Sequence, residues 1–474
     1  MSDEVGQAAG ATQTSDEPKR SPLHARHVEA GAKFSEFGGW SMPLEYPTGV
    51  VKEHNAVRDG VGVFDVSHLG KAMVSGPGAA DFINRTLSND LGRIQQGQAQ
   101  YTLCLDPETG GIVDDLIAYL HDDEHVLIVP NAANSAEVLG RLGDELPDGV
   151  SITDHHEKYA VLAVQGPKSD ETLEALGLPV GHDYMSFVEA EFQGSGLVLC
   201  RTGYTGERGY ELIINNDLAE ALWDALLEAG AEYGIVPCGL GARDTLRTEM
   251  GYPLHGQDLS LDINPLEGRV GWAVGWKKPE FWGRDVLLAA KEKGAERVLR
   301  GLIATGRGIP RPGMGVSLTA DVLLGEVTSG TFSPTLRKGI GLALLPKFVE
   351  DGAEVGVDIR GRREIFTVVK PPSSTPPCAR PDPLVVGRAA VVGRACRDPA
   401  RRWSSRCRWS SRCRWSSLSR PAARPAQPRR DSAQPRPESG QPRAEFARPR
   451  RGQREAPRAA VTRAAVKAIS MEAP

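Results

Sequence analysis

The pattern of hydrophobic and polar positions predicts an α+β fold. Short apolar runs rich in β-branched residues lie between glycine and proline turns, and they alternate with segments whose apolar residues recur at helical spacing. The clearest helix is predicted over 217–230, with Asn216 or Asp217 as its N-cap. Further helices are predicted over 24–31, 80–87, 169–176, 239–249 and 283–293, and another from about Ser135.

The order of these elements indicates two related α+β units and a terminal β domain. A strand, the turn Gly76-Pro77-Gly78, a helix and further strands follow one another, and a similar order restarts after Tyr159. We predict two units over 21–295 with a boundary near residue 155. Six β runs predict a small barrel or sandwich over 296–371, at 300–304, 315–319, 324–328, 340–345, 354–359 and 364–369.

The strand predicted over 110–119 carries two adjacent carboxylates inside an apolar run. Side chains alternate along a strand, so Asp114 and Asp115 should point to opposite faces, and both faces are mostly apolar. At least one carboxylate is therefore expected in a packed or pocket-like region, where an unpartnered ion is unfavourable. The alternative is that one Asp lies at a strand edge and caps a neighbouring turn.

Two other polar groups allow two interpretations each. Asp65 and His68 follow a predicted strand, but no second pair at metal-ligand spacing accompanies them, so a hydrogen-bonded structural histidine is favoured over acid–base or metal chemistry. Arg243 and Arg247 lie one helical turn apart. They can bind an anionic ligand group, or they can pair with Asp244 and Glu249 on a solvated face.

Charge separates the chain into an acidic body and a basic tail. Of the 56 Lys and Arg and 61 Asp and Glu, residues 371–474 hold 23 and 7, which leaves 33 basic and 54 acidic residues in the first 370. The body therefore gives no electrostatic support for nucleic-acid binding, although the tail alone does. The body contains three scattered cysteines, and the chain shows no signal peptide and no long apolar run. These features predict a cytoplasmic protein without a membrane span.

Both ends of the chain are predicted to be disordered. Residues 1–20 are polar, and residues 372–474 are Arg-, Pro- and Ser-rich, with the hexamer 403–408 repeated directly afterwards. Arg with regular Trp is compatible with an RNA-binding or interaction tail. We instead hypothesise a frameshift near Pro372, because the charge reverses abruptly and the repeat is word for word. The other reading frames of the gene test this, since lack of a barrel-ending strand there rules it out.

No P-loop, dinucleotide-binding fingerprint, nucleophile elbow or zinc signature is present. Seven segments, taken together and in this order, nevertheless resemble the aminomethyltransferase (T-protein) family of the glycine cleavage system. The similarity runs from about Ser21 to Pro372, in the segments 37–44, 64–68, 110–116, 164–167, 201–207, 239–244 and 327–334.

That resemblance implies a cloverleaf of three domains around a central folate site. It implies transfer of the carbon of an aminomethyl group, carried on the dihydrolipoyl arm of a partner H-protein, to tetrahydrofolate, with no metal. Asp115 matches the family's acid beside the reactive folate nitrogens, where a carboxylate can stabilise a cationic carbon. Glu207 matches its pterin-binding glutamate and Arg243 its substrate-binding arginine. The remaining matched folate positions are Tyr101, Val129 and Asn131.

The chain departs from the family pattern in two places. Leu69 stands where many relatives have Met, a volume-conserving change expected to be harmless. The family continues past a segment like 368–371 to an arginine that helps bind substrate, whereas Ser373-Ser374-Thr375 follows here. We therefore predict weaker tetrahydrofolate binding or activity than in a variant with the family ending. Isothermal titration of both tests this, and equal affinities would refute it.

Two alternatives to this enzyme remain. The chain can be a non-catalytic RNA-binding or scaffold protein that acts through its tail, in which case salt-dependent RNA binding should vanish on truncation at Pro372. It can also be another folate-dependent relative of the same fold. Repair-type relatives carry a reactive cysteine in the segment matching 201–207, where this chain has none after Cys200, and flavin-linked relatives add a dinucleotide-binding domain that is absent here.

Overall fold

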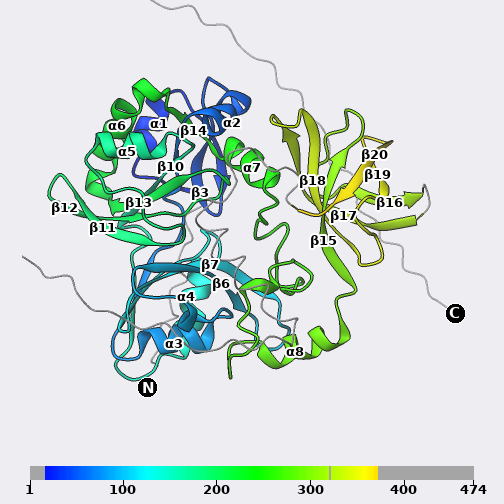
Figure 1. Cartoon of the computed structure of the whole chain (residues 1–474), viewed down its shortest axis with the longest axis horizontal. Helices are drawn as coiled ribbons and strands as arrows, with labels where there is room; N and C mark the ends of the chain where they lie inside the picture. The colour runs from blue at the N-terminus through cyan, green and yellow to red at the C-terminus, as the bar shows by residue number, and fades with distance from the viewer. Residues whose placement is uncertain (1–16, 320–321, 372–474) are drawn as a thin grey trace, which may run out of the picture. The chain divides into compact units, whose positions relative to one another are not determined.

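The computed structural model describes residues 17–319 and 322–371 (Figure 1). They begin with a three-stranded sheet of order β1-β3-β2 and a short helix. The prediction of disorder for 1–20 is wrong for Lys19 and Arg20, because these residues pair in parallel with β3; residues 1–16 lie outside the described part. The bounds are β1 (Lys19–Arg20), α1 (His24–Glu29), β2 (Lys33–Phe37) and β3 (Trp40–Glu45).

A five-stranded antiparallel sheet of order β6-β7-β8-β5-β9 forms the first of two larger units. Helices α3 (Ala79–Thr86) and α4 (Ser135–Asp144) bury Phe82, Ile83 and Val138 against one face of this sheet. The strands are β5 (Ala72–Ser75), β6 (Gln98–Leu105), β7 (Ile112–Asp122), β8 (His125–Val129) and β9 (Ser151–Asp154), with a 3-10 turn, η1 (Leu91–Arg93), before β6.

A six-stranded sheet of order β11-β12-β13-β10-β4-β14 forms the second unit. Helices α5 (Ser169–Ala175) and α6 (Ala219–Ala229) cover one of its faces through Leu173, Leu222 and Trp223. The strands are β4 (Gly62–Asp65), β10 (Tyr159–Gln165), β11 (Phe187–Phe192), β12 (Ser195–Cys200), β13 (Gly209–Asn215) and β14 (Val236–Cys238).

The two larger units share one strand order, as the repeated order of elements in the sequence predicts. In each, a strand is followed by a helix and three antiparallel strands, and the last of these returns to pair with the first. An antiparallel strand then flanks the first strand on its other side, β9 in one unit and β4 in the other. The α+β class with two related units is thus confirmed.

The uncovered faces of the two sheets pack against each other. Tyr119 and Leu127 from one sheet meet Val161 and Ile213 from the other in a shared core. Tyr119 of β7 lies in this shared core, and Asp115 is four residues before it, so the two side chains share one face of the strand. Asp115 therefore points toward the inter-sheet side and Asp114 toward the α3 and α4 side.

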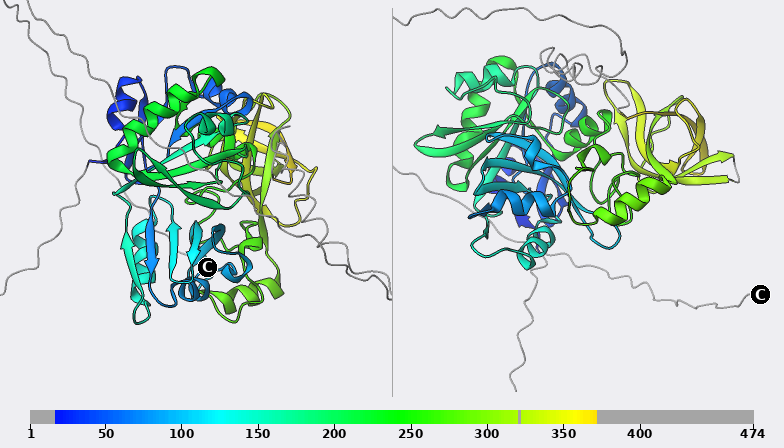
Figure 2. Two further views of the ribbon diagram at one scale, coloured as in Figure 1. Left: turned by 60° about the vertical axis from the view of Figure 1, so that its left-hand side comes forward. Right: turned by 60° about the horizontal axis from the view of Figure 1, so that its bottom comes forward.

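The C-terminal domain is a closed barrel of order β15-β18-β17-β16-β19-β20, which Figure 2 shows in two further views. All six predicted β runs are strands, although β17 is longer than expected. Leu302, Val316, Ala343 and Phe366 fill the interior. The strands are β15 (Arg297–Ala304), β16 (Gly315–Thr319), β17 (Val322–Ser333), β18 (Lys338–Pro346), β19 (Glu354–Ile359) and β20 (Arg362–Val369).

Helix α7 (Leu240–Glu249) contacts both α2 (Val50–Asp59) and β17. The chain then runs to α8 (Arg284–Lys293) through a segment whose Leu259, Val270 and Phe281 pack on Leu103 at the end of β6. That segment contains the 3-10 turn η4 (Gly271–Ala273). Strand β7 and Trp272 of this turn both contribute to the candidate site.

One predicted helix start is wrong. The turn η2 (Asn216–Leu218) precedes α6, and the side chain of Asn215, rather than that of Asn216 or Asp217, accepts a hydrogen bond from the Asp217 N–H. A second 3-10 turn, η3 (Ala231–Tyr233), follows α6. Asn215 is the last residue of β13, so the position where the strand ends fixes the position where the following helical turn begins.

Candidate active site

Asp114 is a structural residue. Its carboxylate is fully buried and accepts hydrogen bonds from the Asn131 N–H (2.9 Å), the Asn131 side-chain amide (2.9 Å) and the Asn134 amide (2.7 Å). Burial raises the pKa of Asp114, while these amide donors act in the opposite direction. Asp114 thus anchors the chain just after β8, as the turn-capping interpretation expects for one acid of the pair.

Asp115 has a different environment on the other face of β7. Its Oδ2 accepts from the Tyr101 hydroxyl at 2.9 Å, and its Oδ1 accepts from the Asn131 amide at 3.0 Å. Burial, followed by the charge of Asp114, raises the pKa of Asp115 to about 6. A β-bulge between Cys104 and Leu105 lies beside the acidic pair and moves Val113 onto the face of Leu116, which simple alternation does not predict.

Aromatic rings gather around this acid. Tyr101 stacks on Trp272 with ring centroids 5.1 Å apart, and 63% of Trp272 is exposed. Tyr204 stacks on Tyr252 at 5.8 Å, and the charge of Asp115 contributes, after burial, to a raised pKa of Tyr204. An exposed ring beside a partly buried acid suits a flat ligand that carries positive or hydrogen-donating atoms.

The two arginines of α7 have separate roles. Arg247 is buried and donates to Asp244 (2.7 Å), to Asp258 (2.8 Å) and to the Ser329 hydroxyl (2.8 Å), so it joins the helix to the barrel. Arg243 lies over the Tyr204 ring at 4.8 Å, and among the described residues its buried Nη1 has no hydrogen-bond partner. The anion-binding interpretation therefore suits Arg243. Arg247 does pair with Asp244, but it is buried rather than on a solvated face, and its second acidic partner is Asp258 instead of Glu249.

The remaining predicted positions lie on neighbouring elements. Val129 ends β8 opposite Ile117, and Asn131 follows it and contacts both acids. Glu207 lies in the loop between β12 and β13, where its buried carboxylate accepts from Arg58 at 2.7 Å. Burial and the charge of Glu207 raise the pKa of Tyr252, while Arg58 acts in the opposite direction. Tyr252 is the ring that stacks on Tyr204.

Sequence reasoning missed several residues of this site. Trp272, Tyr252 and His255 lie in the segment after α7, which has no helical or alternating pattern. His255 hydrogen-bonds the carbonyl of Ile112 (3.0 Å) and the Asn134 amide (2.9 Å), and so ties this segment to β7. Tyr204 lies in the segment 201–207, which carries part of the family resemblance, but no sequence signal singles out its ring.

Asp65 pairs with His27 rather than with His68. His27 Nε2 lies 2.9 Å from Asp65 Oδ2, and the Ser67 N–H donates to Oδ1 at 2.9 Å. Burial opposes the charge, but His27 and the side chains of Ser21 and Ser67 lower the pKa of Asp65 to about 2. Within 17–319 and 322–371, His68 Nδ1 is buried without a hydrogen-bond partner, and no group of three or more His, Cys, Asp or Glu is placed to hold a metal ion.

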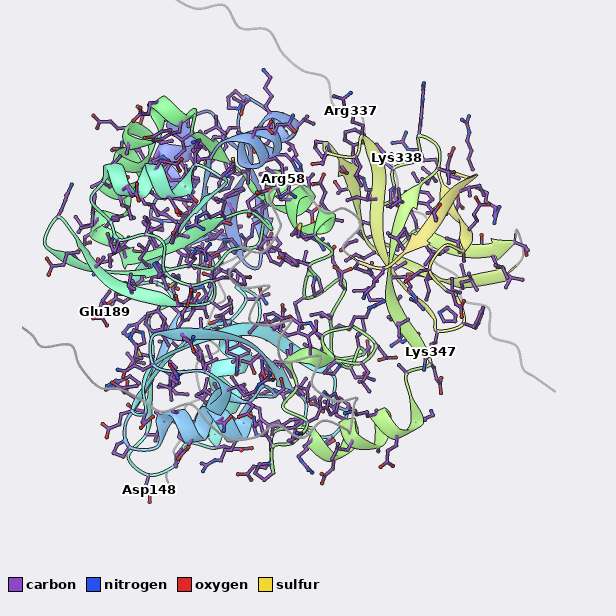
Figure 3. The ribbon with its side chains drawn as sticks, viewed as in Figure 1. Arg58, Asp148, Glu189, Arg337, Lys338 and Lys347 are labelled. Atoms are coloured by element: carbon purple, nitrogen blue, oxygen red, sulfur yellow. The ribbon has the colours of Figure 1, made fainter. Side chains whose placement is uncertain are left out.

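A separate cleft of about 530 Å³ lies between the two sheets. Its lining includes Lys71, His155 and Glu189, the last of which is labelled in Figure 3, and it contains none of the predicted site residues. Cys104, Cys200 and Cys238 are buried and free. None of the helices in the described part of the chain has the length and apolar character to cross a membrane.

Comparisons with known proteins agree with the architecture. A family model described as the GCVT N-terminal domain matches residues 23–278, and one described as the glycine cleavage T-protein C-terminal barrel domain matches residues 297–373. An aminomethyltransferase of Frankia alni is 62% identical over 361 residues, which cover 76% of this chain and 99% of the relative. One of Mycobacterium tuberculosis strain H37Rv is 58% identical over 353 residues, covering 74% and 95%.

A solved structure is also similar. The glycine cleavage system aminomethyltransferase T from Bartonella henselae matches with a TM-score of 0.71 and 33% identity, over 75% of this chain and 97% of that chain. Fold and matches together define a transferase with two related α+β units and a C-terminal barrel. The chain belongs to the glycine cleavage T-protein family and is an aminomethyltransferase, as the resemblance predicts.

Proposed function

We propose that this chain transfers the methylene carbon of an aminomethyl group from the dihydrolipoyl arm of an H-protein to tetrahydrofolate. The observation that carries the proposal is Asp115, which Tyr101 and Asn131 hold at the edge of an aromatic-lined site. In the balanced reaction the carbon loses its bonds to sulfur and nitrogen and gains bonds to two folate nitrogens. The two folate N–H protons leave with the thiol and with ammonia, and 5,10-methylenetetrahydrofolate forms.

The residues fit both substrates chemically. Asp115, as a carboxylate, stabilises positive charge on the carbon in transit, and its hydrogen bonds to Tyr101 and Asn131 fix its orientation in advance. Glu207 accepts N–H bonds from the amino-pyrimidinone edge of the pterin. The Nη1 of Arg243, which has no hydrogen-bond partner within 17–319 and 322–371, suits the anionic glutamate end of folate. We further propose that Val129 contributes backbone contacts to the pterin.

We also propose that a lipoylated H-protein is the macromolecular partner and that the enzyme acts in the cytoplasm. The second part is supported by three body cysteines that are reduced and buried. Release of ammonia from aminomethyl-loaded H-protein, measured with and without tetrahydrofolate, tests the whole proposal. Strong stimulation by tetrahydrofolate is expected, and an equal rate without it contradicts the assignment.

The reaction should depend on the protonation of Asp115. Its pKa of about 6 means that the carboxylate is lost as the pH falls through that value. We expect kcat/KM to rise with pH up to about 6 to 7 and then to level off, because only the ionised form stabilises the cationic carbon. Ammonia release measured from pH 5 to 8 checks this. In Asp115→Asn the limb near pH 6 should disappear, and a retained limb assigns it to another group.

A further inference from the structure

Arg58 binds the loop that carries Glu207 at two points. Its Nη1 donates to Glu207 Oε1 at 2.7 Å and to the Thr205 carbonyl oxygen at 2.8 Å. Arg58 belongs to α2 and is labelled in Figure 3, whereas the loop joins β12 to β13. One guanidinium therefore contacts both the carboxylate and the backbone that positions it.

The other side of Arg58 is bound by the end of α7. Its Nη2 and Nε donate to Glu249 Oε2 at 2.9 and 3.3 Å, and Nη2 also approaches the Leu246 carbonyl oxygen at 3.3 Å. The planar guanidinium thus lies between two buried carboxylates. A lysine carries the same charge but cannot reproduce this fork of directed donors.

Glu249 in turn is held by the barrel. The Ser333 hydroxyl donates to its Oε1 at 2.5 Å, and Thr335 donates through its N–H to Oε1 (3.2 Å) and through its hydroxyl to Oε2 (2.9 Å). His54 Nε2 lies 3.4 Å from Oε1. Burial opposes the charge, yet His54, Ser333 and Arg58 lower the pKa of Glu249 to about 2. The turn after β17 therefore fixes an ionised group that orients Arg58.

We propose that Arg58 is a positioning residue that orients the Glu207 carboxylate for a ligand edge rich in N–H donors, and that the barrel sets this arrangement through Glu249. The physical reason is that the planar guanidinium has donors in fixed directions. It contacts the carboxylate and the backbone of the same loop, so the carboxylate keeps one orientation toward the ligand. This inference rests on the proposed pterin-binding role of Glu207.

Arg58→Lys keeps the charge and removes the fork. We expect the KM for tetrahydrofolate to rise about 10- to 100-fold, which is the loss of affinity that corresponds to losing one hydrogen bond to a charged group. The kcat at saturating folate and the KM for H-protein should remain nearly unchanged. Arg26→Lys is the matched control, because Arg26 forms a more exposed pair with Asp224 elsewhere and should leave all three constants unchanged. An unchanged folate KM in Arg58→Lys overturns the proposal.

Two further variants separate positioning from general stability. In a Glu207→Gln background, Arg58→Lys should add little to the folate KM, whereas equal effects in both backgrounds contradict action through Glu207. Ser333→Ala combined with Thr335→Ala leaves Arg58 and Glu207 in place and tests the barrel directly. It should raise the folate KM severalfold, and a wild-type value overturns the barrel's part.

The same measurements distinguish this inference from the proposed function. If wild-type enzyme releases ammonia without any dependence on tetrahydrofolate, the proposed function itself fails. If tetrahydrofolate stimulates the wild type and Glu207→Gln raises the folate KM, but Arg58→Lys does not, only the positioning inference fails. Circular dichroism and thermal melting of each variant ensure that only folded proteins are compared.

Discussion

Replacing Asp115 by Asn is expected to lower kcat for tetrahydrofolate-dependent ammonia release by about 100-fold or more. Asn keeps the shape and one acceptor for Tyr101 or Asn131, but it cannot balance a cationic carbon, and loss of one such preorganised group reduces turnover by about that factor. Steady-state kinetics with aminomethyl-loaded H-protein measure this. Wild-type turnover in the variant would sink the assignment of Asp115.

The stability of Asp115→Asn should be equal to or higher than that of the wild type. The native pKa of about 6 lies above the ordinary value for Asp, so the native protein binds more protons than the unfolded chain between about pH 4 and 6. The contribution of this group to stability is therefore greatest at low pH and falls as the pH rises through that window. Above pH 6 the ionised carboxylate opposes folding, and Asn removes this term.

Asp114→Asn is the matched control for the neighbouring acid. Burial raises the pKa of Asp114 as well, but its carboxylate accepts three amide hydrogen bonds, and an Asn side chain would turn its NH2 group toward at least one of these donors. We therefore expect a loss of about 1–3 kcal/mol in the free energy of unfolding. Thermal or urea unfolding of the two variants should thus separate the pair. A stable Asp114→Asn beside an unstable Asp115→Asn would reverse the roles given to them.

Replacing Asp258 by Ala is expected to destabilise the protein by about 3–5 kcal/mol. Asp258 is fully buried and accepts from Arg247 (2.8 Å), from Thr328 and Ser329 of β17, and from the Leu254 N–H. Its removal leaves the Arg247 guanidinium buried with much of its charge uncompensated. The contact between α7 and the barrel then loses several hydrogen bonds together.

Urea unfolding of the full chain measures the effect of Asp258→Ala. Asp285→Ala serves as the control, because Asp285 pairs with Arg284 at 3.0 Å but 92% of its side chain is exposed, and exposed pairs contribute little. The control should unfold at the same urea concentration as the wild type. Equal midpoints for both variants would show that the buried pair does not join these elements.

The sequence predicted elements well where a short apolar run or a helical apolar stripe lies between turn residues. Helix α6 buries one stripe, strand β7 is an apolar run buried on both faces, and the six barrel strands are short apolar runs between turns. Helix α2 was not predicted, because its inward face carries Glu53, His54 and Arg58, which are buried through ion pairs and hydrogen bonds made by distant segments. The pairing of β1 with β3 was likewise invisible in two polar residues.

The sequence by itself determined the α+β class, the existence of two related units and a barrel, and, through its family motifs, the enzyme class. Only the tertiary structure shows which groups each acid contacts. Asp114 and Asp115 are adjacent in the chain and both accept from the Asn131 amide, but Asp114 also accepts from Asn134 whereas Asp115 accepts from Tyr101. Arg58 and Glu207 are 149 residues apart, and no local pattern encodes a contact that exists only when two elements pack together.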